Sequence, residues 1–306
     1  MAPQVPGPQN LPVPLNRINA FTVDVEDYFQ VSAFEAAVPR DAWDSVPSRI
    51  DAGMTELLDL LDASSIQGTF FVLGWVARQH PRLIRGIAER GHEVGCHSHE
   101  HRLVYSQTPA EFRADTRLAL DAIQEATGQF CTLYRAPTFS ITRKSLWALP
   151  ILAEEGIRLD SSIYPVIHDR YGIPGAPRFP YRPLREVPDF VEFPPSTFRF
   201  LGMTLPCAGG GYLRIYPPFV TRYALRSING GDGQPAVLYV HPWELDPSQP
   251  VLPAGRLRNL RHRVNIGTMG ARLAGLIARF RFSTMTSALE GLGGPQALPF
   301  SDPAPN

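Results

Sequence analysis

Residues 20–27 read Ala-Phe-Thr-Val-Asp-Val-Glu-Asp, and this stretch indicates the fold. The mostly apolar run at residues 20–25 predicts a buried strand that ends in carboxylates. Other strands are predicted at residues 69–73, 92–96, 133–136, 159–162 and 236–240, and helices at residues 54–61, 81–90, 109–127, 144–155 and 217–228. Strands that alternate with helices of this size predict an α/β fold with a parallel sheet.

Charged or titratable side chains recur at the ends of five predicted strands. They are Asp24, the pair His97 and His101, Arg135, Asp160, and His241. The C-terminal ends of parallel strands lie on one face of the sheet, where active sites form. The sequence therefore predicts a single site assembled from five segments that are far apart along the chain.

The segment His97-Ser-His-Glu-His101 predicts a metal site. On a helical turn, His97 and His101 share a face and could bind one cation, although a solvated polar loop is an alternative interpretation. A catalytic zinc site adds one carboxylate and a water to two histidines. In an extended strand Asp24 and Glu26 share a face, so one could bind the ion while the other accepts a proton from water.

These segments resemble the five motifs of the NodB-homology polysaccharide deacetylases, carbohydrate esterase family 4. In the order of the family's motifs, the matching segments are Asp24-Val-Glu26-Asp27, His97-Ser-His-Glu-His101, Arg135-Ala-Pro-Thr-Phe139, Asp160-Ser-Ser and Leu-Tyr-Val-His241. Order and spacing agree from about residue 20 to residue 245. Segments 24–29, 168–174, 208–212 and 241–244 also resemble signatures of a subgroup linked to bacterial exopolysaccharide and exosortase gene clusters.

The resemblance implies a distorted (β/α)7 barrel of the NodB-homology type that acts as a polysaccharide N-deacetylase. It implies one divalent metal ion, expected to be Zn²⁺, and an N-acetylated oligo- or polysaccharide, or its precursor, as substrate. It also implies an exopolysaccharide context with its assembly machinery as a partner. The open alternatives are hydrolysis of another non-peptide C–N amide bond, such as that of a small cyclic amide, and a catalytically silent carbohydrate-binding protein.

The resemblance also implies roles for individual residues. Asp24 would act as base and His241 as acid on the leaving amine. Arg135 would orient Asp24 and keep it ionised, and Asp160 would pair with His241 and keep it protonated. The oxyanion would be stabilised by the metal and by a backbone N–H near Phe139.

Two departures from the family pattern affect these roles. The usual adjacent Asp pair is absent, so strand alternation assigns Asp24 as base and Glu26 as third metal ligand, with Asp27 as competitor if a bulge turns the strand. Phe139 replaces the motif's tyrosine, which leaves only a backbone role. Tyr212 and Trp243 lie near the catalytic strand ends and could stack on sugar rings, with core packing as the alternative.

Composition limits the classes of function that remain. The 306 residues contain 29 Lys+Arg and 29 Asp+Glu, so no basic excess points to nucleic acid. No apolar run approaches the ~20 residues of a membrane-spanning helix. The first 18 residues hold five prolines and lack a signal-peptide pattern, and three cysteines without CxxC spacing suggest a reducing compartment. The sequence thus predicts a cytoplasmic location.

The predicted organisation is a single deacetylase domain between two tails. Residues 1–18 are expected to form a disordered Pro-rich tail, and residues 293–306 a second one. The domain covers residues 19–292, with a NodB-like core at about 20–245 and a C-terminal helical extension. Within it, residues 165–215 are expected to be loops and hairpin pieces. Four arginines at 256–263 could contact an anionic polymer, although a solvated surface segment is the default interpretation.

Overall fold

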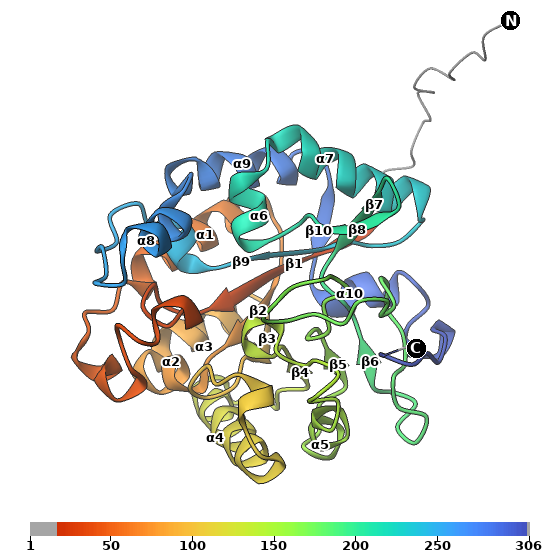
Figure 1. Ribbon diagram of the computed structural model, residues 1–306, viewed down its shortest axis with the longest axis horizontal. Helices are drawn as coiled ribbons and strands as arrows, with labels where there is room; N and C mark the ends of the chain where they lie inside the picture. Colours follow the sequence, from red (N-terminus) through yellow and green to blue (C-terminus); the bar gives the residue numbers. More distant parts are fainter. Residues whose placement is uncertain (1–16, 305–306) are drawn as a thin grey trace, which may run out of the picture.

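The computed structural model describes residues 17–304 (Figure 1). The predicted N-terminal tail lies outside the described residues, except for Arg17 and for Ile18, which begins the first strand. Each helix of the described part is too short or too polar to cross a lipid bilayer.

Eight parallel strands form one sheet. They are β1 (Ile18–Val25), β2 (Thr69–Val72), β3 (Glu93–Cys96), β4 (Leu133–Tyr134), β5 (Leu159–Asp160), β6 (Val191–Glu192), β9 (Val237–Val240) and β10 (Arg281–Ser283). Strand β1 is central, because it pairs with β9 along residues 20–23, with β2 along residues 22–25 and with β10 along residues 18–20. The sheet continues from β2 through β3, β4 and β5 to β6.

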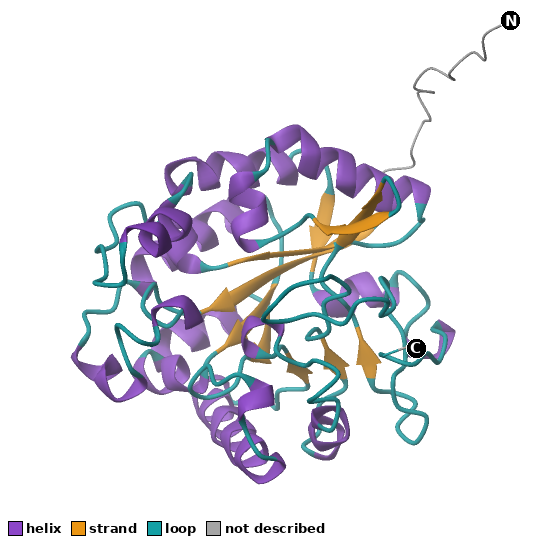
Figure 2. Cartoon of the chain, in the orientation of Figure 1, coloured by secondary structure: helices purple, strands orange, loops and turns teal. Residues whose placement is uncertain are grey.

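Helices surround this curled sheet (Figure 2). They are α1 (Ile50–Ala63), α2 (Gly74–Gln79), α3 (Pro81–Glu89), α4 (Pro109–Thr127), α5 (Ala148–Glu154), α6 (Gly210–Ile215), α7 (Pro218–Arg226), α8 (Arg256–Arg263), α9 (Met269–Ile277) and α10 (Met285–Glu290). The predicted α/β fold of the (β/α)7 barrel type is confirmed in the form of a half-barrel of parallel strands with helices outside.

Local sequence signals set the bounds of helix α4, which match the prediction. Thr108 and Glu111 form a capping box at its start, and Gly128, with φ of 74°, ends it in the left-handed region. Its buried Phe112, Ala119 and Ile123 belong to the core that packs against the sheet. Burial of each large apolar side chain contributes about 1.5–3 kcal/mol, so the apolar faces rather than helix propensity hold these elements together.

Residues 165–215 contain more regular structure than predicted. Besides the expected hairpin, formed by β7 (Thr197–Phe200) and β8 (Met203–Pro206), they contribute β6 to the sheet and helix α6 near its end. Strand β6 has only two residues, which is too short for a periodicity signal, and it is specified by pairing with β5.

The prediction of a disordered C-terminal tail is wrong for residues 293–304, the part of that tail that the structure describes. Leu298 is buried, the Arg182 backbone N–H donates to the Pro299 carbonyl at 2.9 Å, and the Arg182 guanidinium lies 3.9 Å from the centre of the Phe300 ring. The segment is ordered because it covers apolar surface beside β6, a contact that its proline-rich composition does not reveal.

Candidate active site

The C-terminal ends of the strands open into a cavity of about 940 Å³. Its lining includes five of the residues singled out from the sequence, Asp24, Glu26, His97, His101 and His241. A volume of this size fits the range of ligand-binding pockets in proteins. Strand β1 supplies Asp24 directly and Glu26 just beyond its end, because its pairing on both edges carries its C-terminal end into the centre of the site.

Glu26, His97 and His101 form a buried group that could hold a metal ion. One ligand atom from each lies within 4.8 Å of the other two. His97 Nδ1 lies 2.8 Å from the Arg135 carbonyl oxygen. Because a carbonyl can only accept, Nδ1 carries the hydrogen and Nε2 keeps its lone pair, as second-sphere contacts do in metal sites. Burial lowers the pKa of His97 to about 4, which keeps the imidazole in the neutral, metal-binding form.

Glu26 supplies the carboxylate of this group. Its Oε2 lies 2.9 Å from His101 Nε2, and its Oε1 accepts a hydrogen bond from Trp243 Nε1 at 3.3 Å. Burial alone would raise the pKa of Glu26, but the interactions with His101, and those with His241 and His97, lower it to about 2. Two histidines and one ionised carboxylate are the donor set of a catalytic zinc site, so the residues fit a divalent ion.

Asp27 is not part of this group. Its carboxylate accepts from the Tyr28 N–H at 2.8 Å, from Ser48 Oγ at 2.6 Å and from the Arg49 N–H at 2.9 Å. Burial raises the pKa of Asp27. The chain turns after Val25, so that Asp27 joins the end of β1 to the start of α1 rather than facing the histidines.

The segment that carries the histidines is a loop and not the helical turn expected from their spacing. Ser98 and His101 have φ of 67° and 53°, and Thr138 and Phe139, across the cavity lining, have φ of 53° and 51°. Non-glycine residues in this region cost about 1–3 kcal/mol each and are concentrated at functional sites. The Ser98 hydroxyl accepts from the His101 N–H at 3.1 Å and holds this turn, which brings His101 to the same side as His97.

Asp24 is oriented by a fully buried arginine. Arg135 Nη1 donates to Asp24 Oδ1 at 2.7 Å and to Thr22 Oγ1 at 2.8 Å, while Nη2 donates to Ser161 Oγ at 3.0 Å. The guanidinium also lies 4.2 Å from the centre of the Phe71 ring. These contacts leave Asp24 Oδ2 directed towards His241, whose Nε2 is 3.8 Å away.

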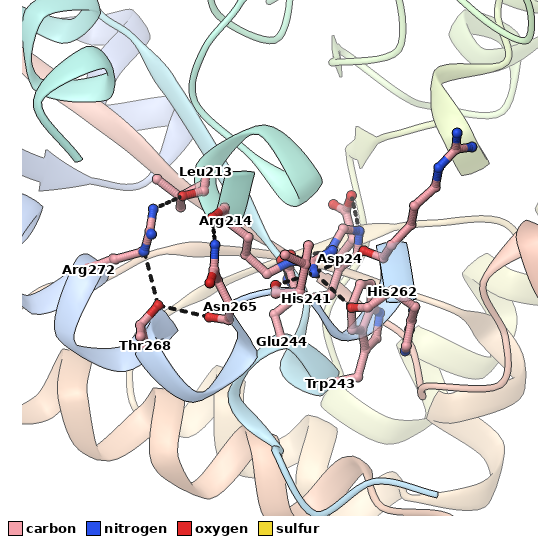
Figure 3. Close-up of polar contacts among 12 residues, drawn as sticks. Asp24, Leu213, Arg214, His241, Trp243, Glu244, His262, Asn265, Thr268 and Arg272 are labelled. Carbon is pink, nitrogen blue, oxygen red and sulfur yellow. Dashed lines mark hydrogen bonds and ion pairs between the residues drawn. The ribbon is translucent and has the colours of Figure 1, made fainter. Parts of the chain in front are cut away.

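His241 is paired with Glu244 (Figure 3). Its Nδ1 lies 3.0 Å from Glu244 Oε2, and Arg214 Nε donates to Glu244 Oε1 at 2.6 Å. Burial would lower the pKa of His241, but the interaction with Glu244, together with Glu26 and Asp24, raises it to about 9. The pKa of Glu244 is about 2, since His241 and Arg214 outweigh the effect of burial. His241 is therefore an imidazolium at neutral pH.

Asp160, the partner expected for His241, is engaged elsewhere. It lies on β5 and accepts from Ser162 Oγ, and its carboxyl group forms a hydrogen bond with that of the buried Glu192 on the neighbouring β6. Burial raises the pKa of Asp160 to about 6 and that of Glu192 further above its ordinary range. Neither carboxyl group lines the cavity, and a hydrogen bond between the two requires that one of them carries a proton.

The residues predicted to bind sugar fall into two kinds. Trp243 is buried, because its indole stacks on His241 with ring centres 5.0 Å apart and on His262 at 4.1 Å. Trp243 also belongs to the cavity lining, but these ring contacts and its 7% exposure leave little of the indole open for stacking on a sugar. Tyr212 lines the cavity, and its hydroxyl lies 3.1 Å from that of Tyr171.

Phe139 also lines the cavity. Its ring packs between Tyr239, at 5.0 Å, and Tyr164, at 5.2 Å. Its backbone N–H donates to the Ala136 carbonyl at 3.0 Å, so an oxyanion would compete with that contact. The ring completes the aromatic wall beside Asp24, and a tyrosine hydroxyl is not needed for this packing.

Sequence reasoning missed two residues of the site, Glu244 and Arg214. A signal for Glu244 existed, since an acid at the third position of a turn that follows His241 forms a capping box with that histidine. Arg214 carried none, because its contact with Glu244 joins residues that are 30 positions apart.

Comparison with known proteins agrees with this geometry. Residues 42–155 match a family model described as "Polysaccharide deacetylase", and residues 161–290 match one described as "Domain of unknown function (DUF3473)". The chain is 33% identical over 88 residues to the peptidoglycan-N-acetylglucosamine deacetylase PgdA of Listeria monocytogenes, covering 29% of this chain and 19% of PgdA. It is 29% identical over 82 residues to the peptidoglycan-N-acetylmuramic acid deacetylase PdaA of Bacillus subtilis, covering 27% and 31% of the two chains. The chain therefore spans less than a third of the length of either relative.

A solved structure extends the similarity to most of the chain. A Mycobacterium smegmatis protein assigned to the polysaccharide deacetylases superposes with a TM-score of 0.59 at 21% identity, over 94% of this chain and 95% of that one. The fold and the site are those of an α/β half-barrel with its polar residues at the C-terminal ends of parallel strands. Residues 42–155 are thus similar in sequence to the polysaccharide deacetylases, and the solved structure has the same fold as this chain.

Proposed function

We propose that this chain is a metal-dependent hydrolase that removes N-acetyl groups from an amino sugar of a bacterial exopolysaccharide or its precursor. One observation carries the proposal. Three kinds of group line the same cavity: the residues that could hold a metal ion, the Asp24 carboxylate that Arg135 orients, and the protonated His241. Amide hydrolysis needs these three parts: electrophilic activation of the carbonyl, a base for water and an acid for the leaving amine.

Glu26, His97 and His101 would hold the ion, for which Zn²⁺ is the choice that suits their donor atoms. Such an ion supplies Lewis acidity, which polarises the acetamide carbonyl and acidifies water. Asp24, oriented by Arg135, accepts the proton of the attacking water at Oδ2. His241 donates a proton from Nε2 to the departing nitrogen, while Glu244 holds the hydrogen on Nδ1.

A second candidate function is hydrolysis of another non-peptide amide on the same scaffold. The Puue allantoinase has the same fold, with a TM-score of 0.56 at 12% identity over 90% of this chain and 89% of that chain. The cavity favours the larger substrate, because about 940 Å³ with a wall that includes Phe139, Tyr171 and Tyr212 suits several sugar rings. A silent binding protein is disfavoured by the intact base and acid.

The test is acetate release from a panel of N-acetylated oligosaccharides, with added Zn²⁺ and with chelator. The wild type should release acetate in a chelator-sensitive manner, and His97→Ala should lose bound metal and activity together. Protein that binds metal but releases no acetate from any member of the panel would contradict the deacetylase assignment. Ring opening of a cyclic amide, which yields one product that carries both the new carboxylate and the freed nitrogen, would then identify the second candidate.

The cytoplasm and the exopolysaccharide assembly machinery are proposed as location and partner. A reducing compartment is supported by the free thiols of Cys96, Cys131 and Cys207. Cell fractionation with an antibody to the chain would test the location. Co-purification with polymer-assembly proteins would test the partner.

A further inference from the structure

The charges on the cavity lining are not balanced. Of the acids there, Asp24 is paired with Arg135 and Glu35 with Arg40, the latter at 2.5 Å, while Glu26 belongs to the metal group with His97 and His101. Arg214, also in the lining, is neutralised by Glu244. Three further arginines of the lining remain, Arg170, Arg258 and Arg261.

These three arginines have no acidic partner within the described residues. Among residues 17–304, no carboxylate forms an ion pair with any of the three guanidinium groups. The only hydrogen bond that the Arg258 side chain makes within the described part is one of 3.4 Å to the Ala33 carbonyl. The wall above the metal group therefore carries an uncompensated positive charge, which attracts anions.

Two of these arginines are held on a fixed element. Arg258 and Arg261 are three residues apart on helix α8 and so lie on neighbouring positions of one face. The C-terminal end of α8 is capped by Arg214, whose Nη1 donates to the carbonyls of His262 at 2.7 Å and Val264 at 2.9 Å. His262 stacks on Trp243 and contacts Gln249 through Nε2 at 2.7 Å.

The helix is thereby tied to the acid side of the active site. Arg214 bonds both to α8 and to Glu244, which in turn pairs with His241 (Figure 3). A freely moving basic surface segment would need none of these contacts. A wall that is positioned in advance binds a ligand at a lower entropic cost.

We propose that the substrate is an acidic glycan in which carboxylate-bearing sugars flank the N-acetylated sugar, and that Arg258 and Arg261, together with Arg170, bind those carboxylates. The planar guanidinium matches a carboxylate in two-point geometry, which favours arginine for this task. This inference rests on the proposed function and narrows its substrate class from N-acetylated polysaccharides in general to anionic ones.

The test compares two forms of one probe. A short oligosaccharide of alternating N-acetylglucosamine and glucuronate is compared with the same oligosaccharide after reduction of its carboxyl groups to alcohols. Dissociation constants are measured by calorimetry on Zn²⁺-loaded protein, and kcat/KM is measured by acetate release. The wild type should bind the acidic form about tenfold more tightly, as expected for two partly exposed ion pairs. About 0.5 M NaCl should remove most of that preference.

Variants assign the preference to the named residues. The double variant Arg258→Gln/Arg261→Gln should bind the two forms within about twofold of each other. Arg256→Gln is the matched control, because Arg256 lies on the same helix, is exposed and does not line the cavity. It should keep the wild-type preference.

The outcomes separate this inference from the proposed function. Equal binding of both forms by the wild type, or binding of neither, would overturn the acidic-glycan inference, and acetate release from any neutral oligosaccharide would still support the deacetylase. A preference that persists in the double variant would overturn the role of these arginines. Preferential binding without acetate release from any substrate would support the anionic site and contradict the deacetylase.

Discussion

His97 is buried and His241 partly buried in the lining of the same cavity, and the two have opposite protonation states. The pKa of His97 is lowered to about 4, and that of His241 is raised to about 9. Burial acts on both in the same direction, against the charged form. The difference lies in the group at Nδ1, which is the Arg135 carbonyl for His97 and the Glu244 carboxylate for His241.

The two histidines therefore show how one site can hold both a neutral imidazole and an imidazolium. A carbonyl dipole fixes the tautomer without repaying the desolvation of an imidazolium, so His97 is a neutral ligand. A full negative charge outweighs that desolvation, so His241 is a proton donor. Environments that push two titratable groups apart in pKa identify the acid and the ligand.

The largest effects should come from replacing a residue that would bind the metal ion. Glu26→Gln should lose bound metal and lower kcat/KM by more than about 100-fold, since a first-sphere ligand matters more than the second-sphere groups whose loss costs 10–100-fold. Asp27→Asn is the control and should retain metal. Metal content by elemental analysis checks both, and unchanged metal in Glu26→Gln would mean that Asp27 or another group is the third ligand.

Replacing the base should separate turnover from metal binding. Asp24→Asn should lower kcat by about 10²–10⁴-fold, the usual contribution of a general base, with metal content unchanged. The amide can still accept the hydrogen bond from Arg135, so the site should keep its shape. Loss of metal in this variant would show Asp24 to be a ligand, and wild-type turnover would show it to be a bystander.

Removing the negative charge of Glu244 should lower the pKa of His241, so that this histidine becomes neutral as His97 is. Glu244→Gln should lower kcat by about 10–100-fold at neutral pH, because the imidazolium loses its partner. For the wild type, activity should fall as the pH rises through about 9, and in the variant that fall should begin at lower pH. The pH profile of kcat measures this change. Circular dichroism checks that the variant still folds, because buried Arg214 loses its charged partner. An unshifted alkaline limb would exclude His241 as the acid.

The smallest effect concerns Asp160 and Glu192, the buried carboxyl pair of β5 and β6. Because the pKa of Glu192 is raised on folding, the native state binds more protons than the unfolded state, and stability decreases as the pH rises above the unfolded value of about 4.5. Glu192→Gln should flatten this decrease between about pH 5 and 8.

The matching loss-of-contact variant is Glu192→Ala, which should cost about 1–3 kcal/mol because Asp160 and the Ile163 N–H lose a partner. Chemical denaturation across pH measures both variants. An identical slope of stability against pH in the wild type and Glu192→Gln would contradict a shared proton.

Much of the fold and the membership of the site could be predicted from the sequence. The run at residues 20–25 predicted the central strand, and Thr108 and Gly128 marked both ends of α4, because periodicity and caps act within a few residues. The gathering of Asp24, His97, His101 and His241 followed from parallel topology alone, since the ends of parallel strands meet at one edge.

The partners of these residues depended on contacts between distant segments. Asp27 bonds to residues 48 and 49, Asp160 pairs with Glu192, and Trp243 is covered by His262. Sequence spacing contains no information about such pairs, because each is decided by how loops and short strands pack after the sheet has formed. Local sequence therefore determined which groups reach the cavity, whereas long-range packing determined which atoms face each other and hence which histidine carries the proton.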